Sequence, residues 1–276
     1  MRENRLPELP QFYGLRRDAH AGIGTSADGI QWQGALRMRK TFWKCALCAC
    51  VLAVVAAGFW MLRERRLQVF SASGLPRAVT VVVDAGHGGE DGGAVSPEGI
   101  PESGLNLSIA LRLRDLLRLS GRRVVMTRTE DVAIGDNSLA TIKARKASDI
   151  RKRVEIVNGE ENSVLLSVHQ NSLPSSPVTR GAQAFWNRRD GGETLAKLIQ
   201  ASLNAEINAG NEKRAYPMND GVYLMKHAEA PGTLIECGFL SNAWETAQLT
   251  QTAYQKKIAA AIAAGYLRYA SGENAE

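Results

Sequence analysis

Apolar and polar positions along residues 78–272 follow two periods, one typical of buried strands and one typical of helices. Short runs rich in valine, leucine and isoleucine predict strands, because such residues without helical spacing favour a buried sheet. The predicted strands are Val79–Val83, Val124–Thr127, Val164–Val168, Gly181–Trp186, Val222–Met225 and Thr233–Ile235.

Other segments carry apolar residues every three or four positions, as on one face of a helix. The predicted helices are Ser103–Leu119, Thr141–Asn158, Glu193–Asn208, Asn242–Leu249 and Tyr254–Tyr269. Strands that alternate with helices predict an α/β fold. We therefore expect a mostly parallel sheet with helices on both faces.

A different pattern precedes this domain. Residues 45–62 form a stretch of 18 residues without a charge, about the minimum that spans a bilayer, and Trp43 and Trp60 lie near its ends. We interpret residues 42–62 as a transmembrane anchor or uncleaved signal. A cleaved signal peptide and a buried core helix are the alternatives. Residues 1–41 are then a cytoplasmic tail, with Met38 as an alternative start, and residues 63–77 a linker.

Charged residues also differ between the N-terminal segment and the domain that follows it. Residues 1–66 hold 11 Lys and Arg against 5 Asp and Glu, whereas the remaining 210 residues hold 23 of each. The net charge of +6 therefore flanks the membrane segment, which argues against a nucleic-acid partner. A short tail before a large domain favours a cytoplasmic N-terminus. We expect a single-pass protein of the cell membrane with an extracytoplasmic domain.

Four chemically active side chains lie close to the predicted strand ends. His87 follows the first strand in a glycine-rich loop, His169 and Glu236 directly follow two later strands, and Glu102 begins a helix. The carboxyl ends of parallel strands meet at one edge of a sheet, so these residues should converge. Two imidazoles and a carboxylate can hold a catalytic zinc ion with an open fourth position. Glu236 could then act as the general base.

Each of these residues also has a structural explanation when taken alone. His87 could be a loop histidine, and Glu102 a carboxylate favoured by the dipole at a helix N-terminus. His169 could be a strand-end residue, and Glu236 could pair with an arginine. The zinc-hydrolase hypothesis therefore depends on the four lying together.

Four sequence blocks carry a family resemblance. VVVDAGHGGEDGGA at residues 81–94, PES at 101–103, SVHQNS at Ser167–Ser172 and PGTLIECGFLSN at Pro231–Asn242 resemble the zinc-dependent N-acetylmuramoyl-L-alanine amidases of the amidase_3 family. The resemblance covers residues 79–270. It implies a three-layer α/β/α fold with a central six-stranded sheet, Zn²⁺ on His87, Glu102 and His169, and catalysis by Glu236. The implied substrate is peptidoglycan, cut between the lactyl group of muramic acid and the L-alanine of the stem peptide.

A finer resemblance concerns the membrane segment, GAQAFWN at 181–187 and the residues 223–242. These are similar to the germination-specific, CwlD-type amidases of spore formers. This implies a role in spore cortex maturation, through muramic-δ-lactam formation, and in germination. An activating protein partner is also expected. A vegetative amidase for cell separation or wall turnover, a zinc peptidase or deacetylase, and a non-catalytic wall-binding scaffold remain alternatives.

Further candidates have weaker arguments. Asp84 ends the first strand and could be either a partner of a zinc-bound histidine or a strand cap. Asn171 and Ser172 could line the substrate cleft. Arg128 could contact a substrate carboxylate or form a structural salt bridge. His227, in a predicted loop before Pro231, could contact the substrate.

Overall fold

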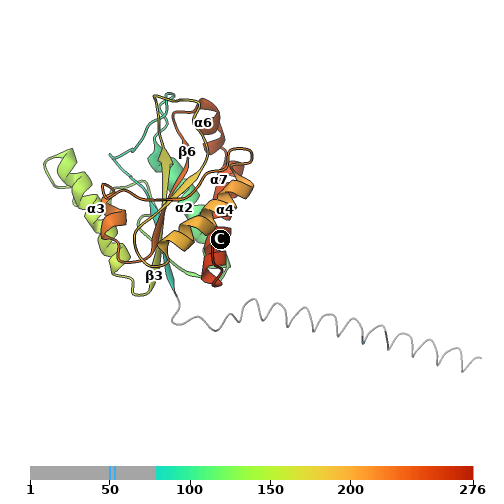
Figure 1. Cartoon of the computed structure of the whole chain (residues 1–276). Coiled ribbons are helices and arrows are strands. Elements are labelled where there is room, and N and C mark those ends of the chain that lie inside the picture. Colours follow the sequence, from blue (N-terminus) through green and yellow to red (C-terminus); the bar gives the residue numbers. More distant parts are fainter. Residues whose placement is uncertain (1–49, 51–52, 54–78, 276) are drawn as a thin grey trace, which may run out of the picture. The chain divides into compact units, whose positions relative to one another are not determined.

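The computed structural model of the protein describes residues 50, 53 and 79–275 (Figure 1). Among these residues, no helix is both long enough and apolar enough to cross a membrane. The predicted tail and linker lie outside the described residues, as does the predicted anchor at 42–62 apart from Cys50 and Ala53.

A single six-stranded sheet forms the centre of residues 79–275, in the order β2-β1-β3-β6-β4-β5. The first four strands in that order run parallel, whereas β4 runs antiparallel to β6 and parallel to β5. The predicted mostly parallel α/β sheet is therefore confirmed. The strands are β1 Thr80–Ala85, β2 Arg123–Met126, β3 Ser163–Asn171, β4 Gln183–Trp186, β5 Tyr216–Pro217 and β6 Gly232–Phe239.

Helices cover both faces of the sheet and make the three layers (Figure 1). The helices are α2 Glu102–Leu119, α3 Ile142–Asn158, α4 Gly192–Glu206, α5 Tyr223–His227, α6 Ala243–Leu249 and α7 Thr252–Ala270. Side chains alternate along each strand, so Val81 and Val83 pack into the core under α2, α4 and α7, while Val82 packs into the smaller core under α3 and α5. The sheet is thus buried on both sides, which explains its continuous apolar strands.

The prediction of a strand at Val222–Met225 is wrong. Val222 has an extended backbone and precedes the short helix α5, in which the consecutive residues Leu224 and Met225 are both buried. An apolar run of four residues fits a buried strand and a buried helical turn equally well, so periodicity could not decide. The strand in this part of the chain is β5, an edge strand of two residues that tolerates Pro217.

Two other strands are longer than predicted. β3 continues past Val168 to Asn171, and β6 continues past Ile235 to Phe239. The two strands pair with each other through His169 and Glu236, so the backbone ladder extends across the polar residues that were expected to end it. His169 and Glu236 therefore lie within strands, where their backbone is fixed more firmly than in a loop.

Candidate active site

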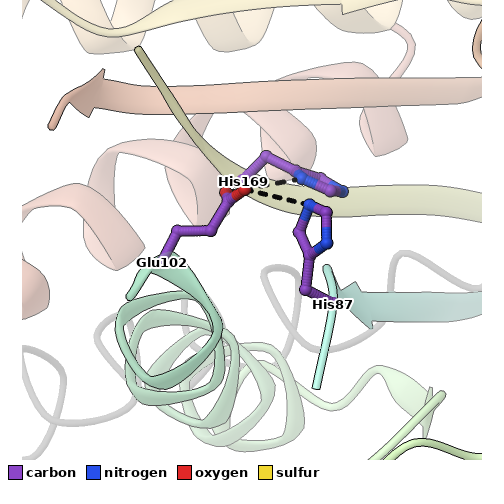
Figure 2. A group of neighbouring side chains, drawn as sticks. All are labelled: His87, Glu102 and His169. Atoms are coloured by element: carbon purple, nitrogen blue, oxygen red, sulfur yellow. Dashed lines mark ion pairs between the residues drawn. The ribbon is translucent and has the colours of Figure 1, made fainter. Parts of the chain in front are cut away.

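Three of the sequence candidates form one compact group at the carboxyl edge of the parallel strands. His87, Glu102 and His169 each offer a ligand atom, and these atoms lie within 4.8 Å of one another (Figure 2). The Nε2 atom of His87 lies 2.9 Å from Oε1 of Glu102, and Nδ1 of His169 lies 3.7 Å from Oε2 of the same carboxylate. Two imidazoles and one carboxylate are the donor set of a catalytic zinc site.

Glu236 is placed by its pairing with His169. The two residues are direct partners in the parallel ladder between β3 and β6. Paired residues on adjacent strands project to the same face of the sheet, so the Glu236 carboxylate lies on the same face as the His169 ring. Oε2 of Glu236 is buried and has no hydrogen-bond partner among the described residues. A buried carboxylate oxygen without a partner calls for an explanation, and a catalytic role is one of those that apply.

Glu102 reaches the site because the loop before α2 folds back on itself. An antiparallel bridge joins Val95 to Pro101, and the backbone N–H of Glu102 donates to the Ala94 carbonyl at 2.9 Å. The Ala94 N–H in turn donates to Oε1 of Glu102 at 2.9 Å, and the Gln170 N–H donates to Oε2 at 2.8 Å. Both carboxylate oxygens are thus held by the backbone, and Glu102 is only 3% exposed.

Two glycines make room for the candidate ligands. A Cβ atom at Gly86 would lie 2.3 Å from Nε2 of His169, and one at Gly93 would lie 2.2 Å from Oε1 of Glu102. Gly93 also has a φ of +70°, which L-residues seldom adopt. Gly86 and Gly93, in the loop that carries His87, therefore make room for the side chains of His169 and Glu102. The sequence pattern alone did not reveal this.

Burial and charge shift the acid–base behaviour of the group. Burial alone would lower the pKa of His87, but its contacts with Glu102 and Asp91 outweigh burial and raise that pKa to about 9. Burial alone would raise the pKa of Glu102, but the contacts with His169 and His87 hold it well below its usual range. The Glu102 and Asp91 carboxylates therefore keep His87 protonated at neutral pH in the absence of a metal ion.

The pKa of Glu236 is raised, whereas that of Glu102 is lowered. Burial raises the pKa of its carboxyl to about 7, and the nearby Glu102 charge adds to this, against the opposing effects of His169 and His87. A carboxylate with a pKa near 7 can both accept and release a proton at neutral pH. Glu102 and Glu236 thus have distinct properties set by their surroundings, one kept ionised and the other poised to titrate.

Asp84 is not bonded to a histidine of the group. Its buried carboxylate accepts hydrogen bonds from Arg153 at 2.7 Å, Ser167 at 2.6 Å and Thr127 at 2.8 Å. Arg153 also donates to the His87 carbonyl at 2.6 Å. Asp84 is therefore linked to the backbone of His87 through Arg153. Residue spacing does not indicate this contact, because Arg153 lies on a helix 66 residues after His87.

The contacts of Arg128 are those of a structural residue. Its side chain is fully buried, and it donates to the carbonyls of Ala85, Gly86, Ser103 and Glu130 at 2.8–3.0 Å. These bonds fasten the His87 loop to the first turn of α2. The guanidinium is therefore engaged with backbone carbonyls, and its Nη1 also lies 3.6 Å from Oδ1 of Asp131.

The remaining candidates separate into near and far positions. Asn171 ends β3 two residues after His169, and its Oδ1 accepts from the Ser172 N–H at 2.8 Å, so both residues lie at the site edge. His227 lies at the opposite end of the parallel strands, near where β6 begins. It ends α5 before β6 begins, its ring lies against Tyr223, and its carbonyl accepts from Asn158 at the end of α3. The structure does not bring His227 to the site.

Comparison with known proteins supports the same assignment. A family model described as N-acetylmuramoyl-L-alanine amidase, Amidase_3, matches residues 81–268. The chain belongs to the amidase_3 family. It is 40% identical over 190 residues to the germination-specific N-acetylmuramoyl-L-alanine amidase of Bacillus subtilis. The match covers 68% of this chain and 78% of that protein. It is 29% identical over 193 residues to LytC of the same organism, covering 35% of that longer amidase.

A solved structure is also similar. The CwlD amidase from Clostridioides difficile, determined in complex with the GerS lipoprotein, matches with a TM-score of 0.68 and 35% identity. The match covers 71% of this chain and all of that one. The resemblance found in the sequence blocks is thus confirmed at the level of the family and of its germination-specific members.

Proposed function

We propose that this amidase is zinc-dependent and hydrolyses the amide between the lactyl group of N-acetylmuramic acid and the L-alanine of the stem peptide. The observation that carries the proposal is the grouping of His87, Glu102 and His169 within 4.8 Å, beside a Glu236 oxygen that has no hydrogen-bond partner among residues 79–275. The donor set fits zinc, and the low pKa of Glu102 keeps its charge available to a cation. Peptidoglycan as substrate follows from family membership.

The residues divide the chemistry between them. His87, Glu102 and His169 would hold the ion, which when bound would acidify water and polarise the substrate carbonyl. Glu236 accepts a proton from the attacking water and delivers it to the nitrogen of L-alanine as the C–N bond breaks. Two bonds from backbone N–H groups keep the Glu102 carboxylate oriented. Asn171 and Ser172 lie where they could contact the substrate.

Product analysis tests the reaction. Purified residues 67–276 are incubated with sacculi, and the soluble and insoluble products are identified by mass spectrometry. Stem peptides with a free N-terminal L-alanine, together with muramic acid bearing a free lactyl carboxyl, support the proposal. Shortened peptides would indicate a peptidase, acetate would indicate a deacetylase, and unchanged sacculi would favour a non-catalytic scaffold.

We further propose that the substrate is spore cortex peptidoglycan, with a role in muramic-δ-lactam formation. The support is the similarity to the germination-specific amidase of Bacillus subtilis. Expression in a Bacillus subtilis strain that lacks this amidase should restore δ-lactam to the cortex and restore germination. Unchanged cortex with altered vegetative walls would instead indicate a role in cell separation or wall turnover.

The cellular setting belongs to the same proposal. The uncharged stretch at 45–62 suggests a single-pass anchor with the N-terminus in the cytoplasm and the amidase domain outside it. The partner of the similar CwlD structure, a lipoprotein, suggests an activating protein partner for this chain as well. Protease digestion of intact protoplasts tests the topology, because an extracytoplasmic domain is degraded whereas a cytoplasmic one is protected.

A further inference from the structure

The two ring nitrogens of His87 have different partners. Nε2 faces Glu102 at 2.9 Å, on the side of the metal-ligand group. Nδ1 faces away from it and bonds Oδ2 of Asp91 at 2.8 Å. An imidazole binds a metal through one nitrogen while its other N–H donates to an oxygen, and this second bond fixes the tautomer. Asp91 therefore leaves only Nε2 for an ion.

The loop is built to bring Asp91 over His87. Gly88 and Asp91 exchange backbone hydrogen bonds of 2.9 and 3.2 Å, which close a tight turn over Gly89 and Glu90. Gly88 and Gly89 have φ values of +142° and +60°. This turn reverses the chain within four residues, so the side chain of residue 91 returns to the ring of residue 87.

Asp91 is itself held on its other oxygen. Oδ1 accepts from the Lys146 ammonium at 2.7 Å and from the Gly93 N–H at 3.3 Å. Lys146 lies on α3, the helix that also carries Arg153. With Oδ1 bonded to Lys146 and Gly93, and Oδ2 bonded to His87, the carboxylate cannot rotate without breaking a contact.

The backbone of His87 is fixed, but its ring needs a further contact to be oriented, and Asp91 provides it. His87 is one of two described non-glycine residues with a positive φ, at +59°, a conformation that is uncommon for L-residues. Arg153 fixes its carbonyl, but the ring can still turn about the side-chain bonds. Asp91 supplies the contact that sets the ring plane.

We propose that Asp91 is a positioning residue of the metal site, which Lys146 orients and which holds His87 so that Nε2 is presented to zinc. The inference rests on the proposed zinc dependence. Asp91 does not touch the substrate. It acts by lowering the cost of ordering His87 and by keeping Nδ1 protonated.

Zinc affinity tests this directly. We measure it by chelator competition for the wild type, Asp91→Ala and Asp91→Asn, and record thermal unfolding of each metal-free protein. Loss of a carboxylate behind a zinc-bound histidine lowers affinity about 10- to 100-fold. We expect that loss for Asp91→Ala, and a smaller one for Asp91→Asn, whose oxygen still accepts from Nδ1. Affinity within twofold of the wild type in both variants would overturn the proposal.

An adjacent ion pair provides a matched control. Arg145 and Glu90 join the same helix to the same loop with bonds of 2.7 and 3.0 Å but do not touch His87. Glu90→Gln should leave zinc affinity within about twofold, because exposed ion pairs contribute little. If Glu90→Gln lost as much affinity as Asp91→Ala, loop anchoring would account for the effect and the proposal would fail.

Nitrogen NMR of the histidine ring separates positioning from a general structural role. In the zinc-loaded wild type, His87 should show a protonated Nδ1 and a metal-bound Nε2. Asp91→Ala should lose the slowly exchanging Nδ1 proton, whereas an unchanged spectrum would contradict the proposal. A wild type that binds no zinc would instead disprove the proposed zinc dependence itself.

Discussion

His169 and Glu236 lie directly opposite each other in the parallel ladder of β3 and β6. The register of two central strands therefore sets the distance between a candidate metal ligand and the candidate base. A hydrogen-bonded ladder holds such a relationship more rigidly than loops do. A shift of one residue in either strand would turn one of the two side chains to the other face of the sheet.

The first prediction concerns Glu236. Glu236→Gln keeps the shape of the side chain but removes its ability to take a proton, so we expect the amidase rate to fall by about 10²- to 10⁴-fold. Zinc content, measured by inductively coupled plasma mass spectrometry, should stay at the wild-type level, because Glu236 is not one of the three proposed ligands. Retention of more than a tenth of the activity would exclude Glu236 as the general base.

A second prediction concerns the space around Glu102. Gly93→Ala would place a methyl group on the Glu102 carboxylate, so we expect a strong loss of zinc binding. The matched control is Gly99→Ala, because Gly99 also has a positive φ, of +85°, but its added Cβ meets no atom within 4 Å. Both variants carry the strain of an unfavourable backbone, and only the first disturbs a ligand. Equal zinc affinity in the two variants would mean that the close approach at Gly93 is unimportant.

A third prediction concerns the buried pair of Asp84 and Arg153. Asp84→Asn removes one of the two carboxylates that pair with the buried Arg153 and leaves only Asp149, so the free energy of unfolding at pH 7 should fall by about 1.5–3 kcal/mol. Glu193→Gln breaks an exposed pair with Lys197 and should change it by less than about 1 kcal/mol. Urea unfolding of the three proteins measures both differences. A similar small change in the two variants would contradict the role given to Asp84.

The same pair has a definite pH dependence. Burial alone would raise the pKa of Asp84, but Arg153, His169 and two hydroxyl groups outweigh burial and hold it below its usual value of 3.8. A carboxyl whose pKa is lower in the folded state contributes stability above pH 3.8 and loses it as the pH falls further. The difference in stability between wild type and Asp84→Asn should therefore narrow below about pH 4. A difference that is constant between pH 7 and pH 3 would be inconsistent with an ionised Asp84.

The sequence was informative about elements and residue types but not about contacts between distant residues. Apolar periodicity predicted five of the six described helices and five of the six described strands, and strand ends identified His87 and His169 as neighbours. It missed β5, since a two-residue edge strand has no pattern, and it misread α5. It also could not show that Arg153, on α3, bonds both Asp84 and the His87 carbonyl.

Asp91 illustrates the limit most clearly. The residue lies within the segment GHGGEDGG, yet its position in the sequence suggests Asp84, at the strand end, as the partner of a zinc-bound histidine. Which acidic residue reaches Nδ1 of His87 depends on the turn formed by Gly88 and Gly89. That turn depends on backbone angles, which residue spacing does not determine.

We propose that a metal ion held by His87, Glu102 and His169 is required for cleavage of the lactyl–L-alanine amide. The most direct measurement is the release of peptides with N-terminal L-alanine from sacculi by wild-type protein, by protein stripped with a chelator, and by stripped protein after one equivalent of zinc. We predict full release, no release and restored release, respectively. Undiminished release by protein that contains no metal would contradict the account.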